Sequence, residues 1–214
     1  MRGRRLRVLD RRLHAWVGGL PASPADRWLR RLSVAADHGK LWLAVAGVLA
    51  LREGAPRRAA LRGVAAQGVS SLVVNEVLKR IFGRVRPDWA NLRSERTLRR
   101  APGTLSFPSG HSSSAAAFVT GVGIEAPAVG ALLAPVALGV GYSRVHVGVH
   151  YPGDVVAGLA IGTGVALAGR RIGRRPDPSP ALAPGATAAP GAPSPAAAPP
   201  GATSQAASPG APGR

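Results

Sequence analysis

The sequence of 214 residues has no cysteine, which excludes disulfide bonds and thiolate chemistry. Acidic residues are also scarce, since ten Asp and Glu stand against 28 Lys and Arg and leave a formal net charge of +18. Aromatic residues make up 4% of the chain. A protein that binds nucleic acid would carry more aromatic side chains among its basic ones, to stack on bases. The composition therefore argues against a nucleic-acid partner.

Long apolar runs are missing as well. Most of the apolar segments are shorter than the ~20 residues that a full membrane span needs. Their small or weakly polar flanks can lengthen them, and arginine clusters between them suit anionic lipid headgroups. Between positions 101 and 170 the only acidic residues are Glu125 and Asp154, which disfavours the alternative of a soluble bundle with an alanine-rich core. Five such segments are found, at 41–51, 59–77, 112–124, 126–142 and 155–169.

These patterns predict an all-α, membrane-embedded bundle of five to six helices. Within 1–39, apolar residues recur at helical spacing opposite arginines, which predicts a basic amphipathic segment at the membrane surface. A twin-arginine signal is an alternative there, although its apolar part is short and contains two glycines. Residues 40–172 form the membrane domain. Residues 173–214 are predicted to be a disordered tail, since eleven of the twenty prolines lie there.

Small residues indicate how the predicted helices pack. Glycine permits close approach of helices in lipid, and this role is predicted for Gly121, Gly123, Gly158, Gly162 and Gly164. The short link at 125–127 predicts an antiparallel hairpin. An up-and-down bundle then places the helix ends near positions 79, 111, 143 and 154 on one side of the membrane.

Three polar stretches converge on that side. They are "KRIFGRVRP" at 79–87, "FPSGHSS" at 107–113 and "YSRVHVGVHYPGD" at 142–154. The third stretch alternates polar and apolar residues, which is typical of a half-buried strand. Alternatively, His146 and His150 are a zinc pair with Asp154, although the glutamate base of the H-E-x-x-H pattern is missing. A third interpretation makes the stretch a link between helices ending near Tyr142 and beginning near Pro152.

Taken together, the three stretches favour a site for a phosphoryl group. Lys79, Arg86 and Arg144 supply positive charge, and guanidinium groups suit bidentate contacts with phosphate oxygens. Ser109 and Gly110 at a helix start offer a hydroxyl and backbone N–H groups.

Two histidines and a carboxylate remain for the chemistry. If the chain is helical between His150 and Asp154, the carboxylate can accept a hydrogen bond from one ring nitrogen and leave the other as a nucleophile. His111 comes from another helix and can protonate the leaving oxygen.

The three blocks, Lys79–x6–Arg86–Pro87, Pro108–Ser109–Gly110–His111 and Ser143–Arg144–x5–His150–x3–Asp154, resemble the signature of the type 2 phosphatidic acid phosphatase (PAP2) superfamily. The resemblance covers about 25–170. It looks closest to the phosphatase half of actinobacterial proteins that join this domain to a lipid kinase.

The resemblance implies six membrane helices and metal-independent hydrolysis of a phosphate ester or diphosphate, with no cofactor. By the same resemblance His150 forms a phosphohistidine, Asp154 orients it and His111 is the general acid. Lys79, Arg86, Ser109, Gly110 and Arg144 hold the phosphate, and His146 packs nearby. His14 and His38 are expected at the surface or the membrane interface.

The expected function is that of an integral membrane lipid phosphatase in the cell membrane, with an extracytoplasmic active site. Phosphatidic acid, phosphatidylglycerol phosphate, polyprenyl (di)phosphates and phosphorylated prenyl sugars all fit as substrates. Two alternatives remain: a vanadate-dependent haloperoxidase-like enzyme, which shares the pocket, and a non-enzymatic basic membrane-binding protein.

Overall fold

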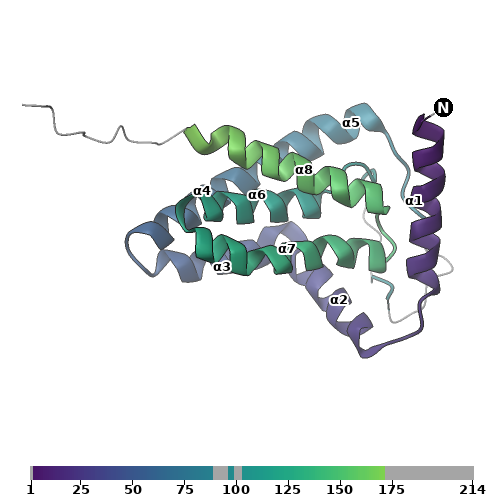
Figure 1. Cartoon of the computed structure of the whole chain (residues 1–214), viewed down its shortest axis with the longest axis horizontal. Coiled ribbons are helices and arrows are strands. Elements are labelled where there is room, and N and C mark those ends of the chain that lie inside the picture. The colour runs from purple at the N-terminus through teal and green to yellow at the C-terminus, as the bar shows by residue number, and fades with distance from the viewer. Residues whose placement is uncertain (1, 89–95, 99–102, 172–214) are drawn as a thin grey trace, which may run out of the picture. The chain divides into compact units, whose positions relative to one another are not determined.

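A computed structural model of the chain describes residues 2–88, 96–98 and 103–171, and throughout these ranges the regular structure is helical (Figure 1). The all-α prediction is confirmed. The predicted tail at 173–214 lies outside the described residues. In chain order the helices are α1 (Arg2–Gly19), α2 (Pro24–Ala35), the 3₁₀ turn η1 (Asp37–Gly39), α3 (Lys40–Ala50), α4 (Ala55–Leu72), the π-helix η2 (Val73–Leu78), α5 (Lys79–Phe82), α6 (Gly110–Glu125), α7 (Pro127–His146), α8 (Pro152–Ala168) and the 3₁₀ turn η3 (Gly169–Arg171).

The five apolar segments of the sequence form the bundle. They correspond to α3, α4 with η2, α6, α7 and α8, which run along the long axis of Figure 1. Helix α6 lies in the middle and packs against α4, α7 and α8. Nine of its residues are buried, including Phe118, whose ring lies 5.3 Å from that of Trp42 on α3. The small and apolar residues on most sides of α6 thus agree with its central position.

Glycines set the distances between the helices, as the sequence predicts. A side chain at Gly121 would lie 3.0 Å from the Cα atom of Gly63 on α4, and one at Gly130 would meet the backbone of Gly123 across the α6–α7 hairpin. A side chain at Gly162 would meet the carbonyl oxygen of Ser113 on α6. Gly164 is an exception, because nothing lies within 4 Å of the position that its side chain would occupy.

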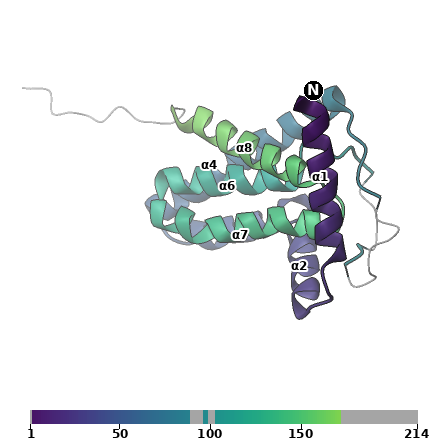
Figure 2. The ribbon, with the colours of Figure 1, turned by 45° about the vertical axis from the view of Figure 1, so that its right-hand side comes forward.

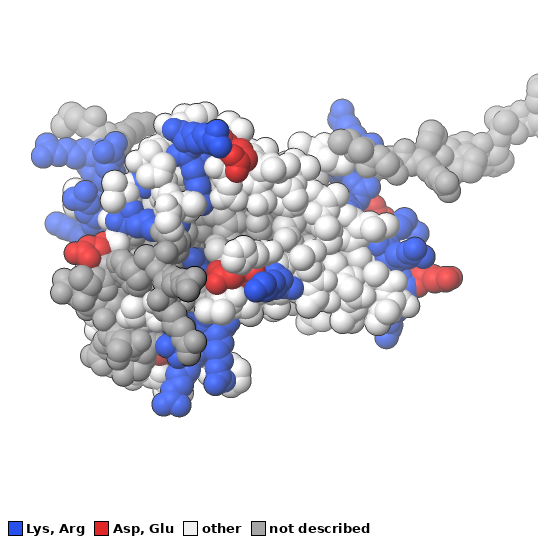
Figure 3. Space-filling view, turned by 180° about the vertical axis from the view of Figure 1, so that it is seen from behind, with Lys and Arg blue, Asp and Glu red and all other residues white. Residues whose placement is uncertain are grey.

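Helix length and composition identify candidate membrane spans. Among the described residues, α7 and the Pro152–Arg171 segment are long and apolar enough to cross a membrane, and α2 with η1–α3 is a third span if this pair, bent by 63°, counts as one. Figure 3 shows Lys and Arg side chains at both ends of the bundle, with a largely uncharged surface between them. This distribution suits a body embedded in lipid with its charges at the headgroups.

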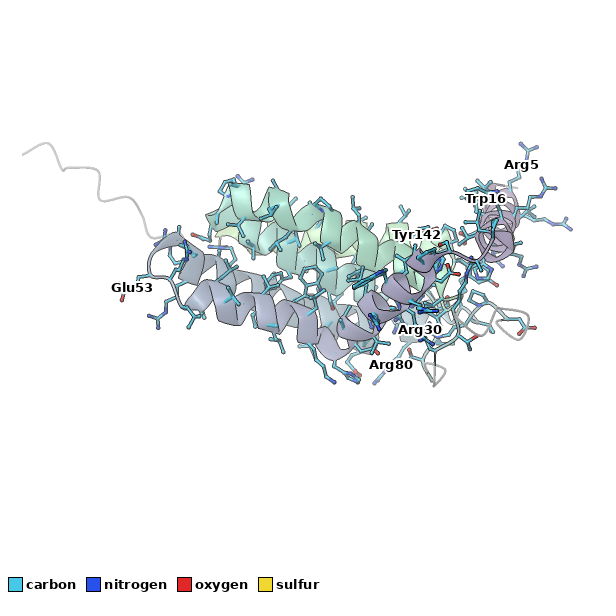
Figure 4. The ribbon with its side chains drawn as sticks, turned by 90° about the horizontal axis from the view of Figure 1, so that it is seen from below. Arg5, Trp16, Arg30, Glu53, Arg80 and Tyr142 are labelled. Carbon is cyan, nitrogen blue, oxygen red and sulfur yellow. The ribbon has the colours of Figure 1, made fainter. Side chains whose placement is uncertain are left out.

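The two N-terminal helices lie where the sequence predicts helices. Helix α1 runs crosswise against one end of the bundle, and α2 descends obliquely beside it (Figures 1 and 2). Figure 4 places Arg5 and Trp16 on α1 at this end, whereas Glu53 marks the opposite end. Most of the apolar side chains of α1 are exposed, among them Leu6 and Trp16, each 66% exposed. Such a helix has apolar and basic groups to offer a membrane surface.

The link between α7 and α8 corrects one expectation. Helix α7 ends at His146 rather than near Tyr142, so Arg144 lies inside its last turn. The reason is packing, since Arg144 and His146 are 1% and 3% exposed and are held by partners on α2 and η1. The alternation of polar and apolar residues therefore belongs to a helix end and a turn, and the strand interpretation is wrong.

Candidate active site

A cavity of about 680 Å³ opens between η1, the C-terminal half of the α4–η2–α5 rod and the start of α6. It lies at the end of the bundle where the four helix ends were predicted to meet. Six of the eight residues predicted for the site line it: Lys79, Arg86, Gly110, His111, Arg144 and His150. Asp154 lies directly behind His150 and is fully buried, and Ser109 is also fully buried beside the cavity.

Two cations share one hydroxyl group at the rim. Lys79 donates a hydrogen bond from Nζ to Oγ1 of Thr104 at 3.1 Å, and Arg86 donates to the same oxygen at 3.0 Å. Arg86 is further fixed by the carbonyl oxygens of Thr104 and Val149, at 2.6 and 2.7 Å. Thr104 was not predicted from the sequence, and only the fold brings it between two cations from another segment.

His150 presents its two ring nitrogens to opposite charges. Its Nε2 accepts a hydrogen bond from Nη1 of Arg86 at 3.1 Å. Its Nδ1 lies 3.6 Å from Oδ2 of Asp154, an ion-pair distance slightly longer than a hydrogen bond. This arrangement favours the tautomer with the proton on Nδ1 and the lone pair of Nε2 turned to the cavity.

A tight turn after the end of α7 positions His150 in the site. The carbonyl oxygen of Arg144 accepts hydrogen bonds from the backbone N–H groups of Val149 and His150, at 3.1 and 3.2 Å. Gly148 has a φ of +72°, a left-handed conformation that glycine adopts without strain. The turn thus keeps the guanidinium of α7 and the imidazole on the same side.

Asp154 is held by more partners than sequence spacing indicates. Its carboxylate accepts hydrogen bonds from Nη1 of Arg84 at 2.8 Å, from the backbone N–H of Tyr151 at 2.9 Å and from the hydroxyl of Ser106. Arg84 also pairs with Asp10 of α1 at 2.7 Å. Neither Arg84 nor Asp10 was predicted. Only the position of Arg84, two residues before Arg86 in a basic run, gave a hint of it.

His111 has a carboxylate partner of its own. Its Nε2 lies 2.7 Å from Oδ1 of Asp37, in the turn η1. The same carboxylate oxygen is 3.7 Å from Nη1 of Arg144, which also donates to the hydroxyl of Ser33 on α2. Asp37 was not predicted. Its place two residues before Gly39, in a polar break before an apolar segment, was the available signal.

Ser109 and Gly110 shape the start of α6. The Ser109 hydroxyl caps the helix by accepting from the backbone N–H of Ser112, at 3.4 Å, and from its hydroxyl at 2.9 Å. The predicted contact of Ser109 with phosphate therefore stays a prediction. Gly110 does line the cavity, and a side chain there would come within 3.3 Å of Asn75 and 3.8 Å of Nζ of Lys79. Glycine at this position leaves the phosphate-sized space open.

His146 belongs to a separate cluster. Its Nε2 lies 2.9 Å from Oδ1 of Asp26 on α2, whose other oxygen is 3.3 Å from Nε of Arg96. This agrees with the packing role expected for His146 and separates it from His150, so the zinc pair finds no support. Across the described ranges, no group of three or more His, Asp or Glu side chains is arranged to hold a metal ion.

Burial sets the protonation state of His150. It lowers the pKa of His150 to about 3, with the nearby Arg86 and Arg144 acting in the same direction and Asp154 opposing them. The imidazole is therefore neutral near pH 7, as a nucleophile must be. Burial also lowers the pKa of Arg86, although its guanidinium stays protonated because an arginine starts near 12.5.

Comparison with known proteins identifies the architecture around this cavity. The model of the PAP2 superfamily matches residues 60–176, more than half of the chain. The chain belongs to the PAP2 superfamily. It is a membrane protein and a PAP2-type lipid phosphatase.

Individual PAP2 relatives support this assignment. A decaprenylphosphoryl-5-phosphoribose phosphatase of Mycolicibacterium smegmatis is 37% identical over 133 residues, which cover 60% of this chain and 68% of that protein. A lipid A 1-phosphatase of Rhizobium johnstonii is 39% identical over 46% of this chain and 41% of its own length. The crystal structure of a transmembrane PAP2-type phosphatidylglycerolphosphate phosphatase from Bacillus subtilis superposes with a TM-score of 0.62 at 22% identity, over 80% of this chain and 89% of that one. The membrane-embedded PAP2 fold is thereby confirmed.

Proposed function

We propose that this PAP2 protein hydrolyses a phosphomonoester or diphosphate of a membrane lipid through a phosphohistidine on His150. One observation supports this most directly: Nε2 of His150 faces the cavity 3.1 Å from Arg86, while Nδ1 faces Asp154 at 3.6 Å. The imidazole ring of the nucleophile thus has a cation for the phosphoryl oxygens at one nitrogen and a carboxylate for the developing imidazolium at the other. Such a preformed arrangement suits phosphoryl transfer, where positioning and electrostatics dominate.

In the first step the lone pair of Nε2 attacks phosphorus and forms the P–N bond. The bond from phosphorus to the leaving oxygen breaks, and that oxygen takes a proton from His111. Asp154 stabilises the positive charge that appears on the His150 ring. In the second step His111 removes a proton from a water molecule, which attacks phosphorus, and the P–N bond breaks to release inorganic phosphate.

Three cations surround the expected position of the phosphoryl group. Lys79 and Arg86 come from the stretch at 79–87 and Arg144 from the end of α7, and all three line the same cavity. Fixed cations of this kind stabilise charge that develops on the equatorial oxygens, and one well-placed donor contributes on the order of 3 kcal/mol to the transition state. Polar partners already hold all three side chains, and when substrate enters Arg86 must release Nε2 of His150 so that its lone pair is free to attack.

Asp37 completes a second histidine–carboxylate pair. At 2.7 Å from Nε2 of His111, its carboxylate orients the ring and stabilises the imidazolium that must donate a proton to the leaving oxygen. We infer that Asp37 is a positioning residue for the general acid, whereas Asp154 serves the nucleophile.

The substrate belongs to the lipid phosphates. The names of the relatives point to a decaprenylphosphoryl sugar phosphate and to lipid A, and the similar solved structure is of a phosphatidylglycerolphosphate phosphatase. Of the substrates expected from the sequence, phosphatidylglycerol phosphate and phosphorylated prenyl sugars agree best with this range. An extracytoplasmic active site in the cell membrane and a likeness to the phosphatase half of phosphatase–kinase proteins both stay predictions.

The test uses purified protein in detergent with EDTA and a ³²P-labelled lipid phosphate. Wild type is expected to release inorganic phosphate, and His150→Ala to lose this activity by at least about a thousandfold, because no other nucleophile replaces the imidazole. His111→Ala should still form acid-labile phosphoprotein from an aryl phosphate and turn it over slowly. His14→Gln on α1 is the matched histidine control. Unimpaired hydrolysis by His150→Ala would refute the assignment.

A further inference from the structure

Four polar side chains recur every fourth residue along the α4–η2–α5 rod. They are Gln67, Ser71, Asn75 and Lys79, and all four line the cavity (for the rod itself, see Figure 1). At about 1.5 Å of rise per residue, Gln67 lies about 18 Å along the rod from Lys79. These residues, called the polar ladder below, therefore lead away from the phosphate-binding end.

The π-helix η2 explains how the polar ladder stays on one face. In a regular α-helix every step of four residues overshoots a full turn by about 40°, so three steps would carry the last residue out of the cavity. The wider π turns of Val73–Leu78, with their i→i+5 hydrogen bonds, fall short of a turn over four residues and cancel the drift. The irregularity thus keeps Asn75 and Lys79 in line with Gln67 and Ser71.

Part of the polar ladder lacks hydrogen-bond partners within the protein. Asn75 donates to the hydroxyl of Ser71 at 3.1 Å. The Oε1 atom of Gln67 is buried, and among the described residues nothing donates to it. Polar groups inside a membrane-embedded bundle are costly and usually mark a functional path. A buried acceptor on the wall of a cavity is free to accept a hydrogen bond from a donor that enters the cavity, whether water or a ligand.

The charges on the cavity wall decide which kind of ligand group the polar ladder can bind. The cations of the cavity, Lys79, Arg86 and Arg144, belong to the phosphate-binding end, whereas the rest of the polar ladder is neutral amide and hydroxyl. Among the described residues that line the cavity, no further Lys or Arg lies beside Gln67 or Ser71 to bind a second phosphate. A bare acyl or prenyl chain would leave the amides unsatisfied. Hydroxyl groups both donate and accept, and so match amide and serine side chains.

The size of the cavity agrees with a ligand that carries hydroxyl groups in addition to its phosphate. At about 680 Å³ it falls within the range of ligand pockets, roughly 300–1,000 Å³, and far exceeds what one phosphate fills. We propose that the polar ladder is a subsite for a hydroxyl-bearing leaving group, a sugar or similar polyol that links the scissile phosphate to the lipid. This rests on the proposed function, and it selects hydroxylated lipid phosphates over phosphatidic acid and plain prenyl phosphates.

The test compares two substrates of equal charge that carry no second phosphate: a prenyl riboside 5-phosphate and its analogue without the two ribose hydroxyls. Wild type in detergent is expected to favour the hydroxylated substrate by about tenfold or more in kcat/KM, since a site that pairs with hydroxyls rejects the analogue lacking them. Gln67→Met and Ser71→Ala should each reduce this preference several-fold. Val69→Leu, exposed on the same helix, is the control that should preserve it.

The outcomes separate the two proposals. Equal kcat/KM values for both substrates in wild type would overturn the subsite while the phosphatase function stands, and this measurement needs no variant to fold. A wild-type preference that neither Gln67→Met nor Ser71→Ala alters would also overturn it. Failure of wild type to hydrolyse either substrate, or phosphatidic acid, would overturn the proposed function and the subsite together.

Discussion

Replacing Asp37 by asparagine is expected to slow the departure of a poor leaving group while sparing a good one. Asparagine keeps the shape of the side chain but removes the negative charge that faces Nε2 of His111 at 2.7 Å. A hydrogen bond to a charged group contributes about 1.5–3 kcal/mol, and each 1.4 kcal/mol corresponds to about a tenfold change in rate. Because Asp37 is 35% exposed and water screens it, the lower end applies. We expect about a tenfold loss in kcat.

The assay compares an alkyl lipid phosphate with p-nitrophenyl phosphate. The alkoxide needs a proton to leave, whereas nitrophenolate departs without one, so only the first substrate depends on the general acid. Asp37→Asn should therefore lose about tenfold on the lipid and little on the aryl ester. Glu76→Gln, which removes an exposed carboxylate paired with Arg80, is the control. Equal losses on both substrates would show that Asp37 only shapes the cavity.

Two further predictions concern folding. Gly162→Ala places a methyl group against the carbonyl oxygen of Ser113 and should lower the free energy of unfolding by about 1–3 kcal/mol, while Gly164→Ala, with open space around it, should not, as thermal unfolding in detergent can show. The pKa of His150 is about 3 in the fold against 6.5 when unperturbed, so the unfolded chain binds a proton that the native one does not. The contribution of neutral His150 to the free energy of unfolding is thus fully present above about pH 6.5 and declines as the pH falls toward 3. His150→Asn should flatten this decline. An unchanged pH profile in that variant would contradict the burial argument.

The sequence was sufficient for the helices because their signals are local. Apolar segments bounded by arginine, glycine and proline located α3, α4, α6, α7 and α8, and apolar residues at helical spacing within 1–39 indicated α1. The short link before Pro127 gave the hairpin. The end of α7 was misplaced because buried partners on other helices extend it to His146, and alternation within a stretch does not report such partners.

The sequence was also sufficient for most of the histidine and charged side chains that line the cavity. Spacing singled out Lys79, Arg86, His111, Arg144 and His150, since chemistry restricts which residue types can hold and attack a phosphoryl group, and all five line one cavity. Other residues that form hydrogen bonds to the catalytic side chains were not predicted. Arg84 and Asp37 reach Asp154 and His111 from 70 and 74 positions away, and no local pattern links residues so far apart.

By itself, then, the sequence determined the helical class, the membrane setting and the type of reaction, because periodicity, hydropathy and side-chain chemistry act over a few residues. Only the tertiary structure decided which carboxylate serves which histidine. It also decided that a π-helix keeps Asn75 and Lys79 on the same face of the rod as Gln67 and Ser71. These outcomes depend on how whole helices pack, and packing is a property of the assembled bundle rather than of any one segment.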